Sequence, residues 1–183
     1  MSQTATSHDT LSDEDAAAKL RDLVKDIRVA MLTTHDADGT LHSRPMYAQE
    51  AEFDGDLWFA TAQSSSLVRQ LQARADVLAT FADTHAQRYV VVRGHAEVTQ
   101  DRDRIREFWN PGMKVWFPAG PEDPEIALVR VHAQRADYWD SPAAPLRWLQ
   151  FVTALATGKR PDAGDRVGLD LDGTTPSVKQ HAS

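Results

Sequence analysis

Residues 57–71 read LWFATAQSSSLVRQL, and this stretch joins a short apolar segment to a helix through three consecutive serines. The aromatic and small residues at its start favour a β-strand. Leu67, Val68 and Leu71 then recur at the spacing of one buried helix face. Serines at a helix start cap the helix by accepting a backbone N–H, or they hold an anion beside the free N–H groups of the first turn. The local sequence leaves both interpretations open and favours the cap, which is the more common role.

On both sides of this stretch the sequence predicts further strands. DADG and FDGD are Gly-containing hairpin signals, and they join the first three strands. Six strands with hairpin connections and few helices predict a mainly β fold with flanking helices, built as a small antiparallel barrel. The six predicted strands cover residues 29–35, 40–50, 56–62, 76–83, 88–100 and 126–140.

Helices are predicted before, between and after these strands. Ser12 precedes a helix whose apolar face carries Ala16, Leu20, Leu23, Val24 and Ile27. Asp101 caps a helix that carries Ile105, Phe108 and Trp109, and Pro145 begins one over 146–157 that ends at Gly158. We therefore expect one domain over residues 12–158, between a flexible leader (1–11) and a flexible tail (159–183).

The composition excludes several functional classes. The chain has 183 residues, a net charge of −7 and no dense Lys/Arg block, which argues against a nucleic-acid partner. It has no cysteine, so thiol catalysis and disulfides are excluded. The seven histidines form no metal-binding motif, and no Walker, G-x-G-x-x-G or G-x-S-x-G sequence is present. With no apolar run long enough for a bilayer and no secretory signal, the expected location is the cytoplasm, without a membrane partner.

Arg44, in LHSRPMY, is the first candidate for ligand binding. Strand alternation puts His42, Arg44 and Met46 on one face, and Pro45 favours an edge strand because it has no N–H. A guanidinium that reaches toward the serines would supply the charge that a phosphate needs. An exposed arginine on an edge strand is the equally frequent alternative.

The segment WNPGMKVWFPAG (109–120) supplies the second candidate, a group of aromatic side chains. Trp109, Trp116 and Phe117 lie in or beside a turn-rich stretch. Such rings stack on a flat ligand or fill an interface. Packing into the core is the more usual role for them.

Taken in order, several segments resemble one family. They are HSRPM, LWFATAQSSSLVRQL, GHAEVTQDRDRIREFWNP, WFPAGPEDP and ADYWD, and they span about residues 20–158. The chain resembles the general stress protein 26 branch of the pyridoxamine 5′-phosphate oxidase-like, FMN-binding split-barrel superfamily. The resemblance implies a six-stranded Greek-key barrel that forms a homodimer, with FMN in a cleft at each end of the subunit interface.

The resemblance also implies which residues bind the flavin. Residues 44–46 would line the ring and the ribityl chain of the flavin. Residues 59–61, at the end of the third strand, would contact the ring through backbone groups and a hydroxyl. Serines at the helix start would face the phosphate, and the aromatic segment would come from the partner subunit. These residues are Arg44, Pro45, Met46, Phe59, Ala60, Thr61, Ser65, Ser66, Trp109, Trp116 and Phe117.

One position departs from the family pattern. Where the family commonly carries a lysine at the helix start, this chain has Leu67. The change removes a charge that would offset a phosphate dianion, and Arg69 is expected to point to a different side of the helix. Arg44 and the helix dipole remain.

These observations support a flavin-binding general stress protein, with FMN as the cofactor and FAD as the alternative. A flavin-dependent oxidoreductase acting on a small acceptor is the enzyme class implied, and no residue is indicated as a catalytic acid or base. Pyridoxamine-phosphate oxidase activity is not expected, because the C-terminal Arg/His pattern of those enzymes is missing. Two alternatives stay open. They are a flavin-free split-barrel dimer that acts as a non-enzymatic binding or interaction module, and a related reductase that uses FAD or a deazaflavin.

Overall fold

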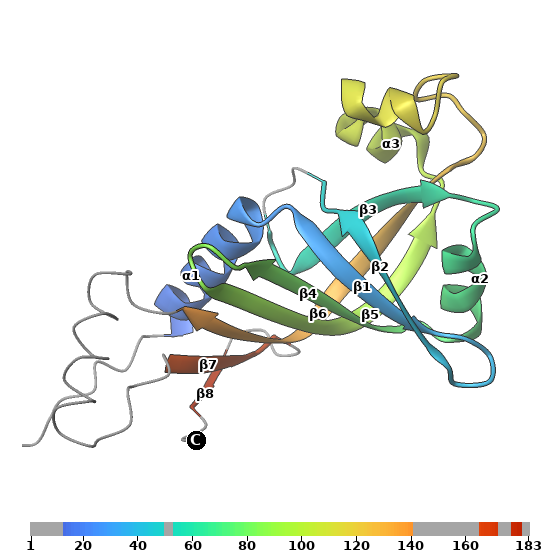
Figure 1. The fold of residues 1–183 in the computed structure, drawn as a ribbon. Helices are drawn as coiled ribbons and strands as arrows, with labels where there is room; N and C mark the ends of the chain where they lie inside the picture. Colours follow the sequence, from blue (N-terminus) through green and yellow to red (C-terminus); the bar gives the residue numbers. More distant parts are fainter. Residues whose placement is uncertain (1–12, 50–52, 141–164, 172–176, 181–183) are drawn as a thin grey trace, which may run out of the picture.

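The computed structural model describes residues 13–49, 53–140, 165–171 and 177–180. These residues form eight strands, three α-helices and one 3₁₀ helix, η1 (Figure 1). The helices are α1 (Asp13–Asp26), α2 (Ser66–Ala73), α3 (Arg102–Phe108) and η1 (Pro111–Val115). The strands are β1 (Val29–His35), β2 (Leu41–Tyr47), β3 (Asp56–Ala62), β4 (Asp76–Asp83), β5 (Arg88–Thr99), β6 (Ile126–Asp140), β7 (Asp165–Asp170) and β8 (Ser177–Gln180).

Six antiparallel strands form the barrel. The sheet runs β2-β1-β4-β5-β6, and β3 pairs with the first half of β6. A single bridge between Ala48 and Phe59 brings β3 back beside the end of β2 and closes the ring. Because β3 crosses to the far side of the sheet before β4 returns beside β1, the connection is a Greek key. This confirms the predicted six-stranded antiparallel split barrel.

The predicted strand positions agree closely with the structure. β1, β3, β4 and β6 have the predicted bounds, while β2 and β5 lie inside the predicted runs. Pro45 lies on β2, whose only ladder in the described residues is with β1, so its missing N–H falls on an edge strand as expected.

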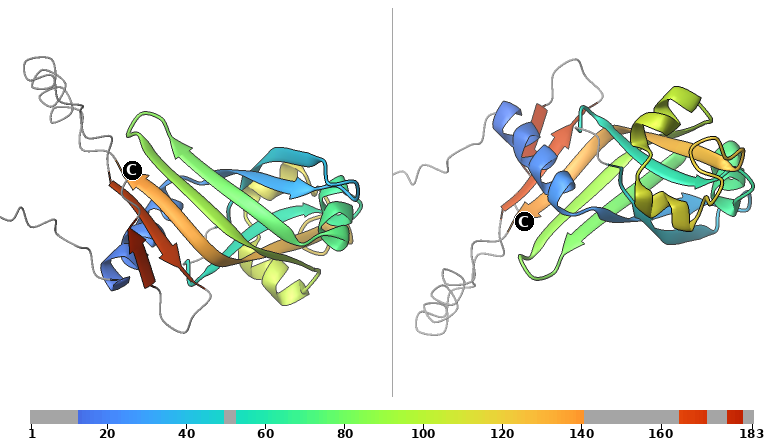
Figure 2. Two further views of the ribbon diagram at one scale, coloured as in Figure 1. Left: turned by 90° about the horizontal axis from the view of Figure 1, so that it is seen from below. Right: turned by 90° about the horizontal axis from the view of Figure 1, so that it is seen from above.

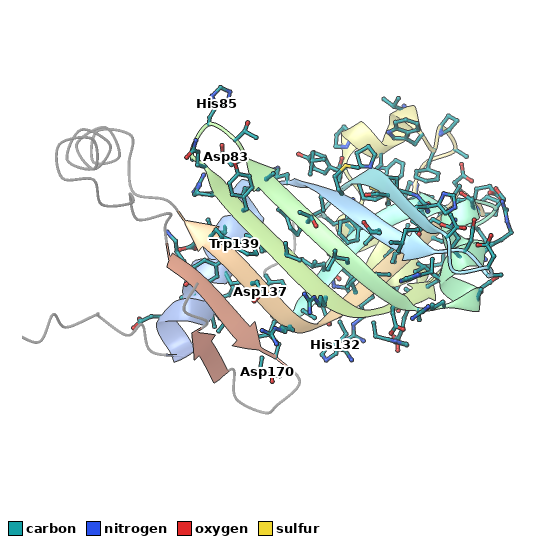
Figure 3. All side chains as sticks on the ribbon, turned by 60° about the horizontal axis from the view of Figure 1, so that its bottom comes forward. Asp83, His85, His132, Asp137, Trp139 and Asp170 are labelled. Carbon is teal, nitrogen blue, oxygen red and sulfur yellow. The ribbon has the colours of Figure 1, made fainter. Side chains whose placement is uncertain are left out.

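The C-terminal segment differs from the prediction. The structure places β7 and β8 within the expected flexible tail (159–183), which corrects that expectation for residues 165–170 and 177–180. β6 has 15 residues and outruns β3, so its second half offers a free edge that β7 fills. Figure 3 shows Asp137 and Trp139 on this half of β6, and Asp170 at the end of β7. The predicted helix at 146–157, the leader at 1–11 and the cap at Ser12 lie outside the described residues.

The core fills the barrel and both of its ends. Leu20, Leu23, Val24 and Ile27 of α1 are buried, as the apolar spacing predicted. α1 lies at one end of the barrel and α2 at the other (Figures 1 and 2). Both helices contribute to one cluster of buried side chains that includes Phe59 and Phe81 from the strands.

A second apolar cluster lies on the outside of the barrel, beneath α3 and η1. Ile105 and Phe108 of α3 pack with Ile126 and Leu128 of β6. The Trp58 ring of β3 lies 5.4 Å from that of Phe108, measured between centroids. α3 and η1 are thus held against the outer face of β3 and β6, and Asp101 caps α3 as predicted.

Candidate functional site

The barrel is open along one seam. In the described residues, the pairing at this seam is the single bridge of Ala48, just after β2, with Phe59 of β3, and the N–H of Gln49 donates to the carbonyl of Trp58 at 2.8 Å. Beyond this point, in the described residues, no ladder joins β2 to the end of β3. The end of β3 past Phe59 therefore has β6 as its only strand neighbour in the described residues. The seam lies between residues 44–46 and residues 59–61, two of the segments that the sequence analysis assigned to the flavin.

Arg44 lies on the inner, half-buried face of β2. His42, Arg44 and Met46 are partly buried, whereas the side chains between them are exposed, as the alternation predicted. The Arg44 guanidinium does not reach the serines. Its Nη2 donates to Oε1 of Gln70 on α2 at 2.5 Å. Gln70 is a member of the site that the sequence analysis missed. The sequence feature that could have revealed Gln70 is a polar amide next to Leu71, on the apolar face of α2.

The Arg44 charge is only partly satisfied. Its Nη1 is enclosed and has no hydrogen-bond partner among the described residues. Burial lowers the pKa of Arg44, while the nearby Asp36 carboxylate raises it. Arginine nevertheless stays protonated at neutral pH, because its ordinary pKa lies far above neutrality. A fixed cation with an unmet donor suits an anionic or carbonyl oxygen on a ligand.

Two of the three serines make contacts within the protein. Ser65 is the N-cap of α2, and its Oγ accepts the N–H of Val68 at 3.3 Å and the hydroxyl of Thr61 at 3.2 Å. Ser64 donates its hydroxyl and its N–H to Oε2 of Glu125, at 2.7 and 3.3 Å. Ser66, the first residue of α2, is exposed. The cap interpretation therefore holds for Ser65, and Ser66 offers the group most accessible to an anion.

The charge balance at the start of α2 differs from what the sequence suggested. Leu67 is 2% exposed and packs into the barrel core, so its position faces inward. Arg69, expected to point elsewhere, turns back, and its Nη1 donates to the carbonyl of Ser64 at 2.8 Å. This corrects the expectation for Arg69, because one cation does lie at the helix start. The Glu125 carboxylate, which accepts the bonds from Ser64, places a negative charge at the same helix start.

The aromatic segment divides between core and surface. Phe117 is 7% exposed and belongs to the outer apolar cluster, against which Trp109 packs. Trp116 is 79% exposed, beside Val115, which is 80% exposed. The segment lies with α3 against the outer face of β3 and β6 (Figure 1), and Nδ2 of Asn110 donates to Oε1 of Gln49 at 3.5 Å.

Other features of the described residues do not coincide with these positions. A cleft of about 1060 Å³ on the outer side of β3 is lined by Trp58, Arg104 and Arg130 with several carboxylates, and by none of the predicted site residues. The described residues contain no group of three His, Asp or Glu side chains placed to hold a metal ion. None of the described helices has the length and apolar character needed to cross a membrane.

A closed antiparallel barrel, split along one seam with a helix start beside it, defines the class as a split-barrel protein. Residues 15–162 match the family described as pyridoxamine 5′-phosphate oxidase like, and the chain belongs to this family. Protein bli-3 of Neurospora crassa is 32% identical over 121 residues, which make up 61% of this chain. The chain spans 58% of the length of that relative.

Solved structures share the fold. A candidate general stress protein 26 from Jannaschia sp. CCS1 superposes with a TM-score of 0.72 at 24% identity, over 86% of this chain and 99% of that chain. A general stress FMN/FAD binding protein from Xanthomonas citri superposes with a TM-score of 0.60 at 29% identity, over 69% of this chain and 89% of that chain. The barrel is therefore the fold of the general stress protein 26 group, as the sequence resemblance implied.

Proposed function

We propose that this protein binds a flavin nucleotide, FMN in the first place, at the seam between β2 and β3. The observation that carries the proposal is the Arg44 guanidinium, which is held at the seam with an enclosed donor that lacks a partner among the described residues. The residues present fit the cofactor. Arg44, Pro45 and Met46 lie on one side of the seam, and residues 59–61 lie on the other, with the Thr61 hydroxyl beside Ser65. The Phe59 side chain is buried and its backbone pairs with Val129 and Ala48, so Phe59 would shape the wall of the site.

The phosphate would lie near the start of α2. Ser66 and the first-turn N–H groups offer donors, and Arg69 supplies the cation that position 67 lacks. The family membership and the Xanthomonas citri relative, described as FMN/FAD binding, support a flavin nucleotide as the ligand. FAD is the alternative cofactor.

Bound flavin would supply hydride or electron transfer, while the protein positions it and tunes its potential. We propose an oxidoreductase acting on a small acceptor in the cytoplasm. Among the described residues of the seam, no side chain is placed as an evident acid or base. The protein's own part is therefore to bind and orient the cofactor.

The second subunit would complete the site, because the protein is proposed to be a homodimer. Val29 and Met31 of β1 and Tyr47 of β2 are 42–52% exposed, and they lie on the outward face of two paired strands. Trp116 protrudes from the α3 side. A self-complementary contact would cover both surfaces and bring the partner's aromatic segment to the seam. Sedimentation equilibrium should give twice the chain mass, and a monomer at micromolar concentration would contradict this proposal.

One observation favours a second candidate function, a flavin-free dimer that acts as an interaction module. Ser64 already donates its hydroxyl and N–H to Glu125, and Thr61 donates its hydroxyl to Ser65, which leaves fewer donors for a phosphate. A carboxylate beside the helix start also repels an anion.

Titration of the purified protein with FMN and with riboflavin, followed by flavin fluorescence, tests both candidates. Saturable binding that prefers FMN supports the flavin site. Loss of one charge-assisted hydrogen bond costs about 1.5–3 kcal/mol, or tenfold and more in affinity. Arg69→Gln should therefore weaken FMN binding by about that factor and leave riboflavin binding unchanged. If neither flavin binds, the interaction module is favoured.

A further inference from the structure

A buried polar cluster lies behind the seam, where α2 packs against β1 and β2. Thr34 and Gln70 are 0% and 5% exposed, and they are two of the three buried polar residues among the described part of the chain. They contact each other, since the Thr34 hydroxyl donates to Oε1 of Gln70 at 2.8 Å. Buried polar side chains are costly unless they are hydrogen-bonded, so two of them together in an otherwise apolar core suggest a specific role.

The Gln70 amide has one orientation. Its Nε2 donates to Oδ1 of Asp36 at 2.6 Å, and an ionised carboxylate can only accept. The amide nitrogen must therefore face Asp36, which turns Oε1 toward Thr34 and Arg44. Asp36 is itself held by His42, whose Nε2 lies 2.6 Å from Oδ2.

This orientation fixes Arg44. A buried Oε1 that faces β2 accepts Nη2 of Arg44 at 2.5 Å. Only one of the five guanidinium N–H groups is committed by this bond, and Nη1 stays enclosed without a partner among the described residues. The amide thus holds the cation in place without neutralising it, because an amide carries no charge. A carboxylate at position 70 would have formed an ion pair and reduced the attraction for a ligand oxygen.

We propose that Gln70 is the positioning residue of the flavin site. It holds the Arg44 guanidinium at the seam, with spare donors for an oxygen of the bound flavin nucleotide. This inference rests on the proposed function and adds a residue to it. Gln70 itself lies too deep to touch the ligand, so its effect passes through Arg44.

The test is a double-mutant cycle read by FMN affinity. Gln70→Leu keeps the side-chain size and removes all three hydrogen bonds, and Gln72→Leu is the matched control on the same helix, where the side chain is exposed. We expect Gln70→Leu to raise the FMN dissociation constant by about tenfold or more, and Gln72→Leu to leave it unchanged. In an Arg44→Met background, Gln70→Leu should cause no further loss.

A merely structural role predicts a different result. It would lower the melting temperature of the flavin-free protein and weaken binding equally with or without Arg44. The visible spectrum of bound flavin would then stay as in the wild type, whereas a displaced guanidinium should shift it toward that of Arg44→Met. Wild-type affinity in Gln70→Leu, or a loss that adds in full to that of Arg44→Met, overturns the inference.

Asp36→Ala keeps the test decisive if Gln70→Leu does not fold. The Asp36 side chain is 43% exposed, so its removal leaves the core intact while it frees the amide to turn. The inference is supported if Asp36→Ala weakens FMN binding in the wild type and has no effect on FMN binding in the Arg44→Met background. Unchanged FMN binding in Asp36→Ala overturns it. If the wild type binds no flavin, the proposed function fails first, and this result is distinct from wild-type binding with an indifferent Gln70.

Discussion

Leu67 allows the charge balance of the flavin site to be tested directly. If the missing family lysine were the reason for weak flavin binding, Leu67→Lys would restore it. The structure predicts otherwise, because Leu67 is 2% exposed and packs in the main core. The introduced ammonium would have to stay buried or force α2 to shift. We therefore expect Leu67→Lys to destabilise the fold without strengthening FMN binding.

The size of the effect follows from this burial. Full burial of a leucine side chain contributes about 1.5–3 kcal/mol, and large changes at buried leucines cost about 2–5 kcal/mol. At about 2–4 °C per kcal/mol for a chain of this size, the melting temperature should fall by about 4–20 °C. Leu67→Met is the matched control, and it should cost less than about 1.5 kcal/mol because it conserves volume.

The pH dependence gives the prediction a second measurement. Burial depresses the pKa of an ammonium, so the unfolded chain binds more protons than the folded one between the two pKa values. The stability of Leu67→Lys should therefore rise toward that of the wild type as the pH approaches about 10.4, the ordinary lysine value. Differential scanning fluorimetry from pH 7 to 10 would show this. A melting temperature equal to that of Leu67→Met, together with tighter FMN binding, would refute the reasoning and place position 67 at the ligand.

Three further predictions concern the fold around the site. Ser65→Ala should cost about 1 kcal/mol in urea unfolding, because it removes the cap of α2, whereas Ser66→Ala should stay within about 0.5 kcal/mol; equal losses would contradict the cap. Gly94→Ala should cost about 1–3 kcal/mol, because the new Cβ would lie 2.2 Å from a backbone carbonyl oxygen of β6; a wild-type melting temperature would show that the strands separate easily. Hydrogen bonds, first that from the N–H of Ala86, lower the pKa of Asp83 at the β4–β5 turn (Figure 3). This contribution is present above the ordinary aspartate pKa and is lost as the pH falls through the lower folded value, so the stability gap between wild type and Asp83→Asn should close below about pH 4 and not widen.

The barrel could be predicted from the sequence because its strands alternate cleanly and its turns carry glycine. β3 and β6 are far apart in the chain, yet each was recognised from local pattern alone. β7 and β8 were not recognised, because β7 (DRVGLD) is rich in Asp and Gly and β8 (SVKQ) has only four residues. What orders them is pairing with a neighbouring strand edge. That edge exists only because β6 continues past the end of β3.

The candidate site was predictable in part. Alternation placed Arg44 on the inner face, and helix periodicity placed Ser65 at the start of α2. The contacts that decide their roles are long-range, because Gln70 lies 26 residues from Arg44 and Glu125 lies 61 from Ser64. No local pattern encodes such pairs. The sequence thus indicated the groups that could meet a ligand, and the structure identified the groups that hold them.

The long strand β6 divides one edge between two neighbours, with β3 along its first half and β7 along its second. The barrel strand β3 and the C-terminal strand β7 therefore both pair with β6, but each pairs with different residues of β6. β7 also places Leu169, which is 0% exposed, in the main apolar cluster. Changes to β7 should therefore alter the stability of the core while the register between β3 and β6 stays as it is.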